Sequence, residues 1–186
     1  MKLFVFLFVF LIFVSQSCEE NKTRYPLNKK KDVFLKTSAF RNKALYSSEE
    51  FLIKKAAKLD SLNKYHISDV GFLYAKIKST NKNFPLPEKG EKVRFKYQIE
   101  DLDKNIIYSY KELGIVEYLI DQENLLPALR EGIRIMRPME IAVFLFPSYL
   151  CYGYQGDGEK IGMNQPLKFT VELLKLQKKK YESQTN

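Results

Sequence analysis

Residues 92 to 100 read K-V-R-F-K-Y-Q-I-E and alternate strictly between polar and apolar side chains. Val93, Phe95, Tyr97 and Ile99 share one face, and Lys, Arg, Gln and Glu side chains share the other. Because successive side chains of a β-strand point to opposite faces, this pattern predicts a strand with one buried face. A strand that is buried on one face and solvated on the other is typical of an antiparallel sheet.

Further stretches on both sides of this one also have the character of strands. Residues 71–78 precede it, and the turn residues D-L-D-K-N follow it and lead into I-I-Y-S-Y at 106–110. Residues 139–146 and 166–176 are predicted as the remaining strands. The last stretch places four apolar residues on one side: Leu167, Phe169, Val171 and Leu173. At least five strands are therefore expected.

One short helix is predicted between these strands, in N-L-L-P-A-L-R-E-G-I at residues 124–133. Pro127 suits the first turn of a helix, and Gly132 suits the left-handed position just past its end. Little more than one turn fits between them, so this helix cannot be stable alone and must lie across the sheet, burying residues such as Leu129. The predicted fold class is α+β, with an antiparallel five- to six-stranded sheet wrapped around one short helix.

A second helix is expected before the sheet, in a segment of helix and connection at residues 47–69. Ser47 or Ser48 is a candidate N-cap, and Glu50 stands three residues after Ser47, as in a capping box. Apolar residues recur at helical spacing in Leu52, Ala56, Leu59 and Leu62, with Phe51 beside them. The pattern predicts an amphipathic helix packed on the domain; use as a dimer arm is the alternative.

The beginning of the chain has the pattern of a targeting segment. Residues 3–14 are apolar without a break and follow Lys2. Twelve helical residues span about 18 Å, which is too short for a hydrocarbon core of about 30 Å. Residues 1–17 are therefore predicted to be a secretory signal peptide rather than a membrane span.

The next residues, S-Q-S-C at 15–18, resemble the lipobox of bacterial lipoproteins. That resemblance implies that Cys18 is lipidated and becomes the first residue of the mature chain. Ser15 stands where leucine is usual, and an ordinary cleaved signal is the alternative. The polar, Lys-rich residues 18–46 are then expected to be a flexible, lipid-anchored tether.

Charge and cysteine content limit the other possibilities. The formal net charge is +9, but its only dense runs, Lys29–Lys31 and Lys178–Lys180, lie outside the periodic segments and accompany no nucleic-acid motif. We therefore expect no nucleic-acid partner and interpret residues 178–186 as a basic tail. If Cys18 is lipidated, Cys151 has no disulfide partner. The sole histidine, His66, is far from Cys151 in the sequence, so Cys151 is expected to be a buried structural thiol rather than a nucleophile.

Four features together resemble a known family: the strand that carries Tyr97, the short helix that begins at Pro127, P-S-Y-L-C-Y-G-Y at 147–154 with Ile161 after it, and F-T-V-E-L-L-K-L at 169–176. Over residues 70–177 they resemble the FK506-binding-protein (FKBP) type of peptidyl-prolyl cis-trans isomerase. With the lipoprotein signal, the chain looks like the gliding-motility-associated isomerase lipoproteins of Bacteroidetes. The resemblance implies a cofactor-free isomerase of proline-containing polypeptides, anchored through Cys18 in the cell envelope and facing the periplasm or the cell surface. The oligomeric state is left open, with a monomer as the default.

The resemblance also implies a site, in which the backbone N–H of Leu126 and the Tyr152 hydroxyl hold substrate carbonyls. The implied catalytic residues are Tyr97, Tyr152 and Phe169. The implied substrate-binding residues are Ile107, Tyr108, Val116, Leu125, Leu126, Leu129 and Ile161. No metal is implied, because rotation about an X–Pro amide makes and breaks no covalent bond and needs only apolar, aromatic and hydrogen-bonding groups.

Two departures from the family pattern favour an alternative function. Leu129 stands where a tryptophan floor is common, and Ile107-Tyr108 stands where Phe-Asp is usual. The carboxylate that normally orients Tyr152 is thus missing; Tyr108 either replaces it through its own hydroxyl or caps the pocket, and Asp157 is interpreted as a solvated loop residue. The alternative is a non-catalytic peptide-binding chaperone or structural lipoprotein on the same fold.

Overall fold

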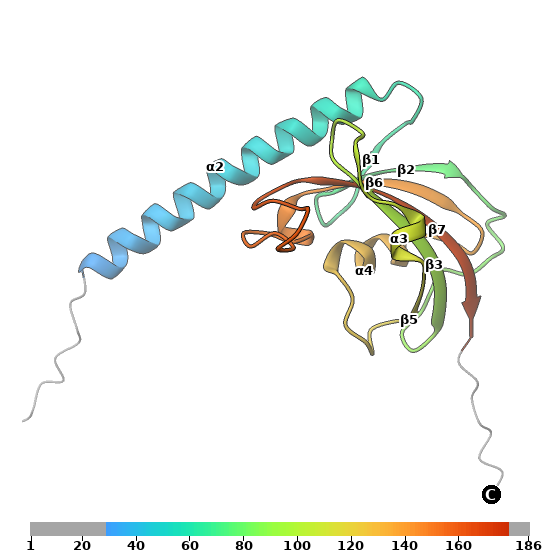
Figure 1. Ribbon diagram of the computed structural model, residues 1–186. Helices are drawn as coiled ribbons and strands as arrows, with labels where there is room; N and C mark the ends of the chain where they lie inside the picture. The colour runs from blue at the N-terminus through green and yellow to red at the C-terminus, as the bar shows by residue number, and fades with distance from the viewer. Residues whose placement is uncertain (1–28, 179–186) are drawn as a thin grey trace, which may run out of the picture. The chain divides into compact units, whose positions relative to one another are not determined.

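The computed structural model describes residues 29–178, with side chains from Thr37 onward (Figure 1). Seven strands form one antiparallel sheet in the order β1-β2-β6-β7-β3-β4, with β5 also paired to β3. Their bounds are β1 His66–Ile67, β2 Leu73–Lys78, β3 Lys92–Glu100, β4 Ile106–Tyr108, β5 Ile115–Leu119, β6 Ile141–Phe146 and β7 Leu167–Gln177. The α+β class is confirmed. The two strands missing from the prediction are β5 and the very short β1.

Strands β4 and β5 share one side of β3 and are separated by a helical turn. Ile99 pairs with Tyr108 in β4, whereas Phe95 pairs with Val116 in β5. Between them, Ser109 caps the short helix α3 (Tyr110–Leu113) and forms a capping box with Glu112. The extended structure predicted through residue 110 therefore ends at Tyr108, because the Ser109 side chain accepts from the N–H of Glu112 and so starts a helix.

The inward faces predicted for β3 and β7 are confirmed. In β3 the side chains of Val93, Phe95 and Ile99 are fully buried and Tyr97 is half-buried. In β7 the buried residues are Leu167, Phe169, Val171 and Leu173. Period-two alternation thus identified the core face of the two central strands, which pair along most of their length.

Helix α4 (Pro127–Arg134) packs on the concave side of the sheet and buries Leu129, as predicted (Figure 1). Gly132, however, lies inside the helix and not beyond its end. A Cβ atom at this position would come within 3.3 Å of Cζ of Phe144, a buried residue of β6. The glycine is therefore needed for close helix–sheet packing rather than for a left-handed helix end.

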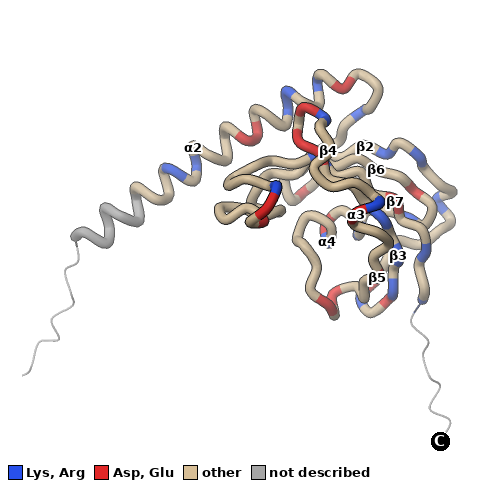
Figure 2. The backbone as a smooth tube through the Cα atoms, viewed as in Figure 1, with Lys and Arg blue, Asp and Glu red and all other residues tan. Residues whose placement is uncertain are grey.

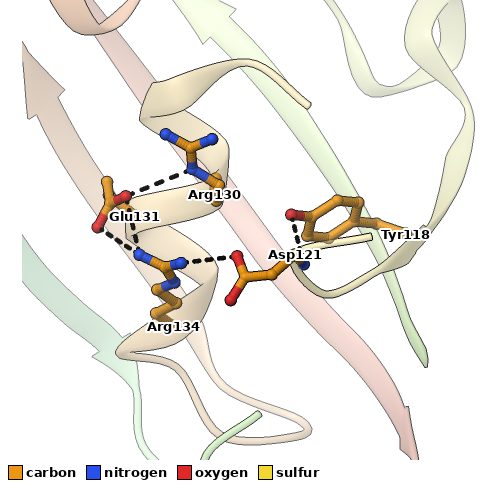
Figure 3. A network of polar contacts seen from close by, with 5 residues as sticks. All are labelled: Tyr118, Asp121, Arg130, Glu131 and Arg134. Carbon is orange, nitrogen blue, oxygen red and sulfur yellow. Dashed lines mark hydrogen bonds and ion pairs between the residues drawn. The ribbon is translucent and has the colours of Figure 1, made fainter. Parts of the chain in front are cut away.

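A polar network anchors α4 to the turn that follows β5 (Figure 3). Nη2 of Arg134 donates to Oδ1 of Asp121 at 2.6 Å, and the Asp121 N–H donates to the Tyr118 hydroxyl at 3.1 Å. On the helix itself, Glu131 accepts from Arg134 at 3.0 Å and from Arg130 at 3.4 Å. Because Tyr118 is buried, the network joins the last turn of the helix to the core.

Helix α2 (Lys29–Leu59) begins eighteen residues earlier than the predicted helix. Residues 29–46, which were expected to be part of a flexible tether, are helical. The chain divides between Phe40 and Arg41 into two compact units, and the contacts of α2 given below are made by its residues in the second unit.

The face that α2 packs on the sheet also differs from the predicted stripe. Phe51, Leu52 and Leu59 are exposed, as is Leu62 beyond the helix, whereas Ile53 is buried against Leu73 of β2 and Leu145 of β6. Of the predicted stripe, only Ala56 is partly buried against this cluster. The small apolar patch on the outer side of β2 and β6, rather than the longest apolar stripe on the helix, determines which side of α2 is buried.

No helix within residues 29–178 is both long enough and apolar enough to cross a membrane. The predicted signal peptide, Cys18 and nearly all of the predicted basic tail lie outside the described residues.

Charged side chains on the solvent face of β3 are paired across the strands. Lys92 and Arg94 contact Glu117 of β5 at 2.8 and 3.3 Å, and Lys96 contacts Glu172 of β7 at 2.8 Å. Figure 2 shows cations and acids interspersed along the strands. The lysines of β3 therefore lie on the solvent-facing side of the sheet and form ion pairs there, as the alternation predicts.

Candidate active site

The ten candidate catalytic and substrate-binding residues lie in one hydrophobic cluster, between the sheet and α4 or against its edge. Leu129, Ile161 and Phe169 are buried members of the cluster. The other seven are partly buried and pack against it: Tyr97, Ile107, Tyr108, Val116, Leu125, Leu126 and Tyr152. These side chains come from four strands, α4 and two loops, so a partly exposed apolar surface has been assembled from distant parts of the chain.

Tyr97 and Phe169 form an aromatic wall on β3 and β7. Phe169 pairs with Ile99, and Tyr97 pairs with Val171, so the two rings are diagonal neighbours on one face. The rings stack at 6.0 Å between centroids with an interplanar angle of 9°, and Phe146 meets Phe169 edge-on at 5.4 Å. A fully buried ring thus supports a half-buried one. Phe146 was missed because β6 is buried almost throughout, so its sequence shows no alternation that would mark the inward face.

Tyr152 lies in a turn after the short 3₁₀ helix η2 (Ser148–Leu150). The Ser148 carbonyl accepts hydrogen bonds from the N–H groups of Cys151 and Gly153, both at 2.9 Å. Burial, with Tyr97 and Asp157 nearby, raises the pKa of Tyr152 to about 12, so its hydroxyl is protonated at neutral pH. Within residues 29–178 that hydroxyl makes no hydrogen bond, which leaves it able to donate to a substrate.

The loop after Tyr152 is closed by Asp157. Its Oδ1 accepts from the N–H of Ile161 at 2.8 Å and of Glu159 at 2.9 Å. Its Oδ2 accepts from the Tyr108 hydroxyl at 2.5 Å. Asp157 is a partly exposed loop residue, as interpreted, but it also orders the loop that carries Ile161 and links that loop to β4.

The Tyr108–Asp157 hydrogen bond shifts the pKa of both groups. Burial raises the pKa of Asp157, but the hydrogen bonds from Tyr108 and from backbone N–H groups outweigh it and lower the pKa to about 2. The same bond raises the pKa of Tyr108. Tyr108 is thus a neutral donor to a charged carboxylate, and its hydroxyl is used by Asp157 rather than by Tyr152. A carboxylate is present near the site, but the loop supplies it.

Lys160 connects the same loop to β4 and α3. Its ammonium lies 4.5 Å from the centroid of the Tyr108 ring and contacts Glu112 of α3 at 2.8 Å. It also donates to the carbonyl of Ile107 at 3.3 Å. Sequence reasoning missed Lys160, because these contacts join residues about fifty positions apart and leave no local pattern.

The approach to α4 supplies the remaining polar group. Leu126 is the N-cap residue, and Pro127 follows it at the first helical position. The Leu126 N–H therefore precedes the hydrogen bonds of the helix, and in the part of the chain that the structure describes it has no partner. Beside the buried Leu129, this N–H is available to a carbonyl group.

The groups that could support other chemistry are poorly placed for it. Cys151 is buried as predicted, and burial raises the pKa of its thiol, so the reactive thiolate is disfavoured. His66 lies exposed in β1. Among residues 29–178, no three His, Cys, Asp or Glu side chains are grouped as metal ligands. What the cluster presents is apolar surface, stacked rings and single hydrogen-bond donors.

Residues 85–174 match the family model of the FKBP-type peptidyl-prolyl cis-trans isomerase. The chain contains an FKBP-type isomerase domain. A curated relative, the probable FKBP-type peptidyl-prolyl cis-trans isomerase FkpA of Neisseria meningitidis serogroup B, is 34% identical over 91 residues. These residues are 48% of this chain and 33% of the relative, so the chain spans about a third of that relative's length.

Solved structures show that the fold of the FKBP-type domain is shared. A peptidyl-prolyl cis-trans isomerase from Pseudomonas syringae has a TM-score of 0.58 at 18% identity, over 73% of this chain and 96% of that one. FkpA from Escherichia coli has a TM-score of 0.58 at 19% identity, over 95% of this chain and 82% of that one. The family match begins at residue 85, so α2, β1 and β2 precede the matched part of the FKBP-type domain.

Proposed function

We propose that this protein is a peptidyl-prolyl cis-trans isomerase that acts on proline-containing polypeptides and needs no cofactor. The observation that carries the proposal is the Tyr152 hydroxyl, a donor that has no partner within residues 29–178, near the stacked rings of Tyr97 and Phe169. The match to the FKBP-type family supports it.

The proposed mechanism requires only these groups. The barrier to rotation about an X–Pro bond is roughly 20 kcal/mol and arises from amide resonance. In the twisted transition state this resonance is lost and the carbonyl is less polar, so an apolar surface favours the twisted form over the planar one. Tyr97 and Phe169 hold the prolyl ring, while the Tyr152 hydroxyl and the Leu126 N–H hold carbonyl groups in the rotated geometry.

The alternative is a peptide-binding chaperone that uses the same surface without catalysis. Leu129 favours it, because a buried leucine at the end of the site offers no flat aromatic surface for a prolyl ring. Binding without rate enhancement is the behaviour that separates the two functions.

We propose further that the protein acts in the cell envelope, anchored through an acylated Cys18 and facing the periplasm or the cell surface. The apolar residues 3–14 and the S-Q-S-C that follows them support this. The proposed substrates are cell-envelope proteins that are still folding, among them components of a gliding motility machinery. The motility part of the proposal rests on the resemblance to motility-associated isomerase lipoproteins.

The experiment is an exchange measurement by NMR on a tetrapeptide with leucine before proline, with substoichiometric full-length protein. The spontaneous reaction takes tens to hundreds of seconds, so catalysis is visible as exchange that appears only with protein. Shifts of the peptide signals without added exchange would establish the binding module in place of the enzyme. A peptide with glutamate before proline is the matched comparison, and the apolar wall predicts slower exchange for it.

A further inference from the structure

A buried carboxylate joins α2 to the turn that carries Tyr152. Glu49 is 2% exposed and Ser148 is 1% exposed. Oε2 of Glu49 accepts from the Ser148 N–H at 2.8 Å, and Oε1 accepts from the Ser148 hydroxyl at 2.6 Å. A buried carboxylate is costly unless it is hydrogen-bonded, so these two bonds restrict how α2 and the turn meet.

The Glu49–Ser148 pair completes the start of η2. The residue before η2 is Pro147, which offers no side-chain hydrogen bond, so the Ser148 N–H at the start of the 3₁₀ helix lacks a local partner. Glu49 provides the acceptor from an element 99 positions earlier in the chain. Its carboxylate therefore acts as a cap that the local sequence does not supply.

Ser148 connects this cap to Tyr152. Its carbonyl accepts from the N–H groups of Cys151 and Gly153, which are the two neighbours of Tyr152 in the chain. The bonds from Glu49 thus continue through one residue to the backbone on both sides of Tyr152. Next to Ser148, Tyr149 meets Tyr46 of α2 edge-on at 5.3 Å and donates its hydroxyl to the Val70 carbonyl at 3.1 Å.

We infer that Glu49 is a positioning residue, through which α2 sets the orientation of the Tyr152 hydroxyl. Because α2 lies before the residues that match the family, this support is an addition to the FKBP-type domain. The inference deepens the proposed isomerase function and rests on it for its catalytic consequence. The structural consequence, a displaced Tyr152 when Glu49 is changed, is independent of catalysis.

The first test observes Tyr152 directly, by NMR of the full chain with ¹³C-labelled tyrosine rings. Loss of a signal in Tyr152→Phe assigns the resonance. Glu49→Ala should shift or broaden it, and Glu49→Gln should restore much of it, since an amide can still accept from the Ser148 N–H. The matched control is Glu50→Ala, because Glu50 is exposed and its carboxylate pairs with Lys54 of the same helix rather than with the turn. A Tyr152 resonance unmoved by Glu49→Ala would overturn the inference.

The second test is a double-mutant cycle on kcat/KM. Glu49→Ala should lower kcat/KM by about three- to tenfold, mainly through kcat, which matches the loss of one oriented hydrogen bond. In the Tyr152→Phe background the same change should cost less than about twofold, because the two residues act through one hydroxyl. Equal losses in both backgrounds would show that Glu49 only stabilises the fold and would refute a positioning role.

If Glu49→Ala does not fold, Ser148→Ala, which removes the hydroxyl that donates to Glu49, replaces it in both tests. If the parent shows no isomerisation, the proposed function fails, whereas the NMR comparison still decides whether Glu49 positions Tyr152.

Discussion

Tyr152 and Tyr154 flank Gly153, yet their environments are very different. Tyr152 is half-buried beside Tyr97 and Asp157, and its pKa is raised to about 12, whereas Tyr154 is 75% exposed. Gly153, with a φ of 55°, turns the chain so that the two rings separate. Position within one turn therefore distinguishes a candidate carbonyl donor from a solvated side chain.

Tyr152→Phe should lower kcat/KM by about three- to tenfold, the usual range for one lost side-chain hydrogen bond. The melting temperature should change little, because the hydroxyl makes no hydrogen bond within residues 29–178 and the ring volume is kept. Tyr154→Phe removes an exposed hydroxyl and should change neither quantity. If Tyr152→Phe isomerises prolyl peptides as fast as the parent, Tyr152 is not the donor.

The Tyr108–Asp157 hydrogen bond should respond to acid. The pKa of Asp157 is lowered from 3.8 to about 2, so its stabilising effect is present above pH 3.8 and is lost as the pH falls towards 2. The Tyr108 ring resonance should therefore move in that window, and Asp157→Asn should abolish the movement. The Lys160 contact lowers the pKa of Glu112 to about 2 as well, so the local resonance is a better measurement than the melting temperature. A Tyr108 signal that is flat between pH 5 and pH 2 would contradict this assignment.

Helix α4 shows how an element is held where the site needs it. Its first turn presents Leu126 and Leu129, while its second turn is held by the contacts of Arg134 and by the close approach of Gly132 to Phe144. A helix of two turns has little stability alone, so its position depends on these tertiary contacts.

Gly132→Ala should destabilise the protein, although alanine is the better helix former. Alanine gains about 1 kcal/mol in helix propensity, but an overpacked core costs about 1–3 kcal/mol. The new Cβ would lie 3.3 Å from the Phe144 ring, which is fully buried and packs against Phe72 and Phe146. A net loss of about 1 kcal/mol should lower the melting temperature by about 2–5 °C. Gly158→Ala is a useful comparison, because there the strain comes from φ alone, with no atom within 4 Å of the new Cβ. An increased melting temperature for Gly132→Ala would show that the ring can yield.

At the scale of the whole molecule, both sides of the sheet take part in packing, the outer side as well as the concave side. Strand β6 is buried almost throughout, because α4 covers one face and Ile53 of α2 packs against Leu145 on the other. The FKBP-type domain of this chain is therefore extended by a helix that contacts both the sheet and the turn before Tyr152.

The proposed lipid anchor at Cys18 leads to a separate prediction. Cys18→Ala should abolish labelling by a palmitate analogue and release the protein from membranes or leave an uncleaved precursor, since the S-Q-S-C stretch follows a twelve-residue apolar run. Cys151→Ala is the matched control, because its thiol is buried and should not be acylated. Labelling that persists in Cys18→Ala would disprove lipidation at this position.

Much of the fold could be predicted because its signals are local. The alternation in β3 and β7 repeats every two residues, and the start of α4 is marked by a proline in the first turn, so neighbouring residues carry enough information to place a face or an end. The ten domain residues of the candidate site were predicted from the family resemblance, and the structure brings all ten to one cluster.

The features that could not be predicted depend on contacts between distant residues. Asp157 meets Tyr108 across 49 positions, and Glu49 meets Ser148 across 99, so neither pair leaves a periodic signal in the sequence. Gly132 suited a helix end as well as a close approach, and only the neighbouring Phe144 ring distinguishes the two. The buried face of α2 likewise depends on what the sheet offers it. Local periodicity determines which side of a strand can be buried, whereas packing between elements determines which polar groups meet and thus how the site is held.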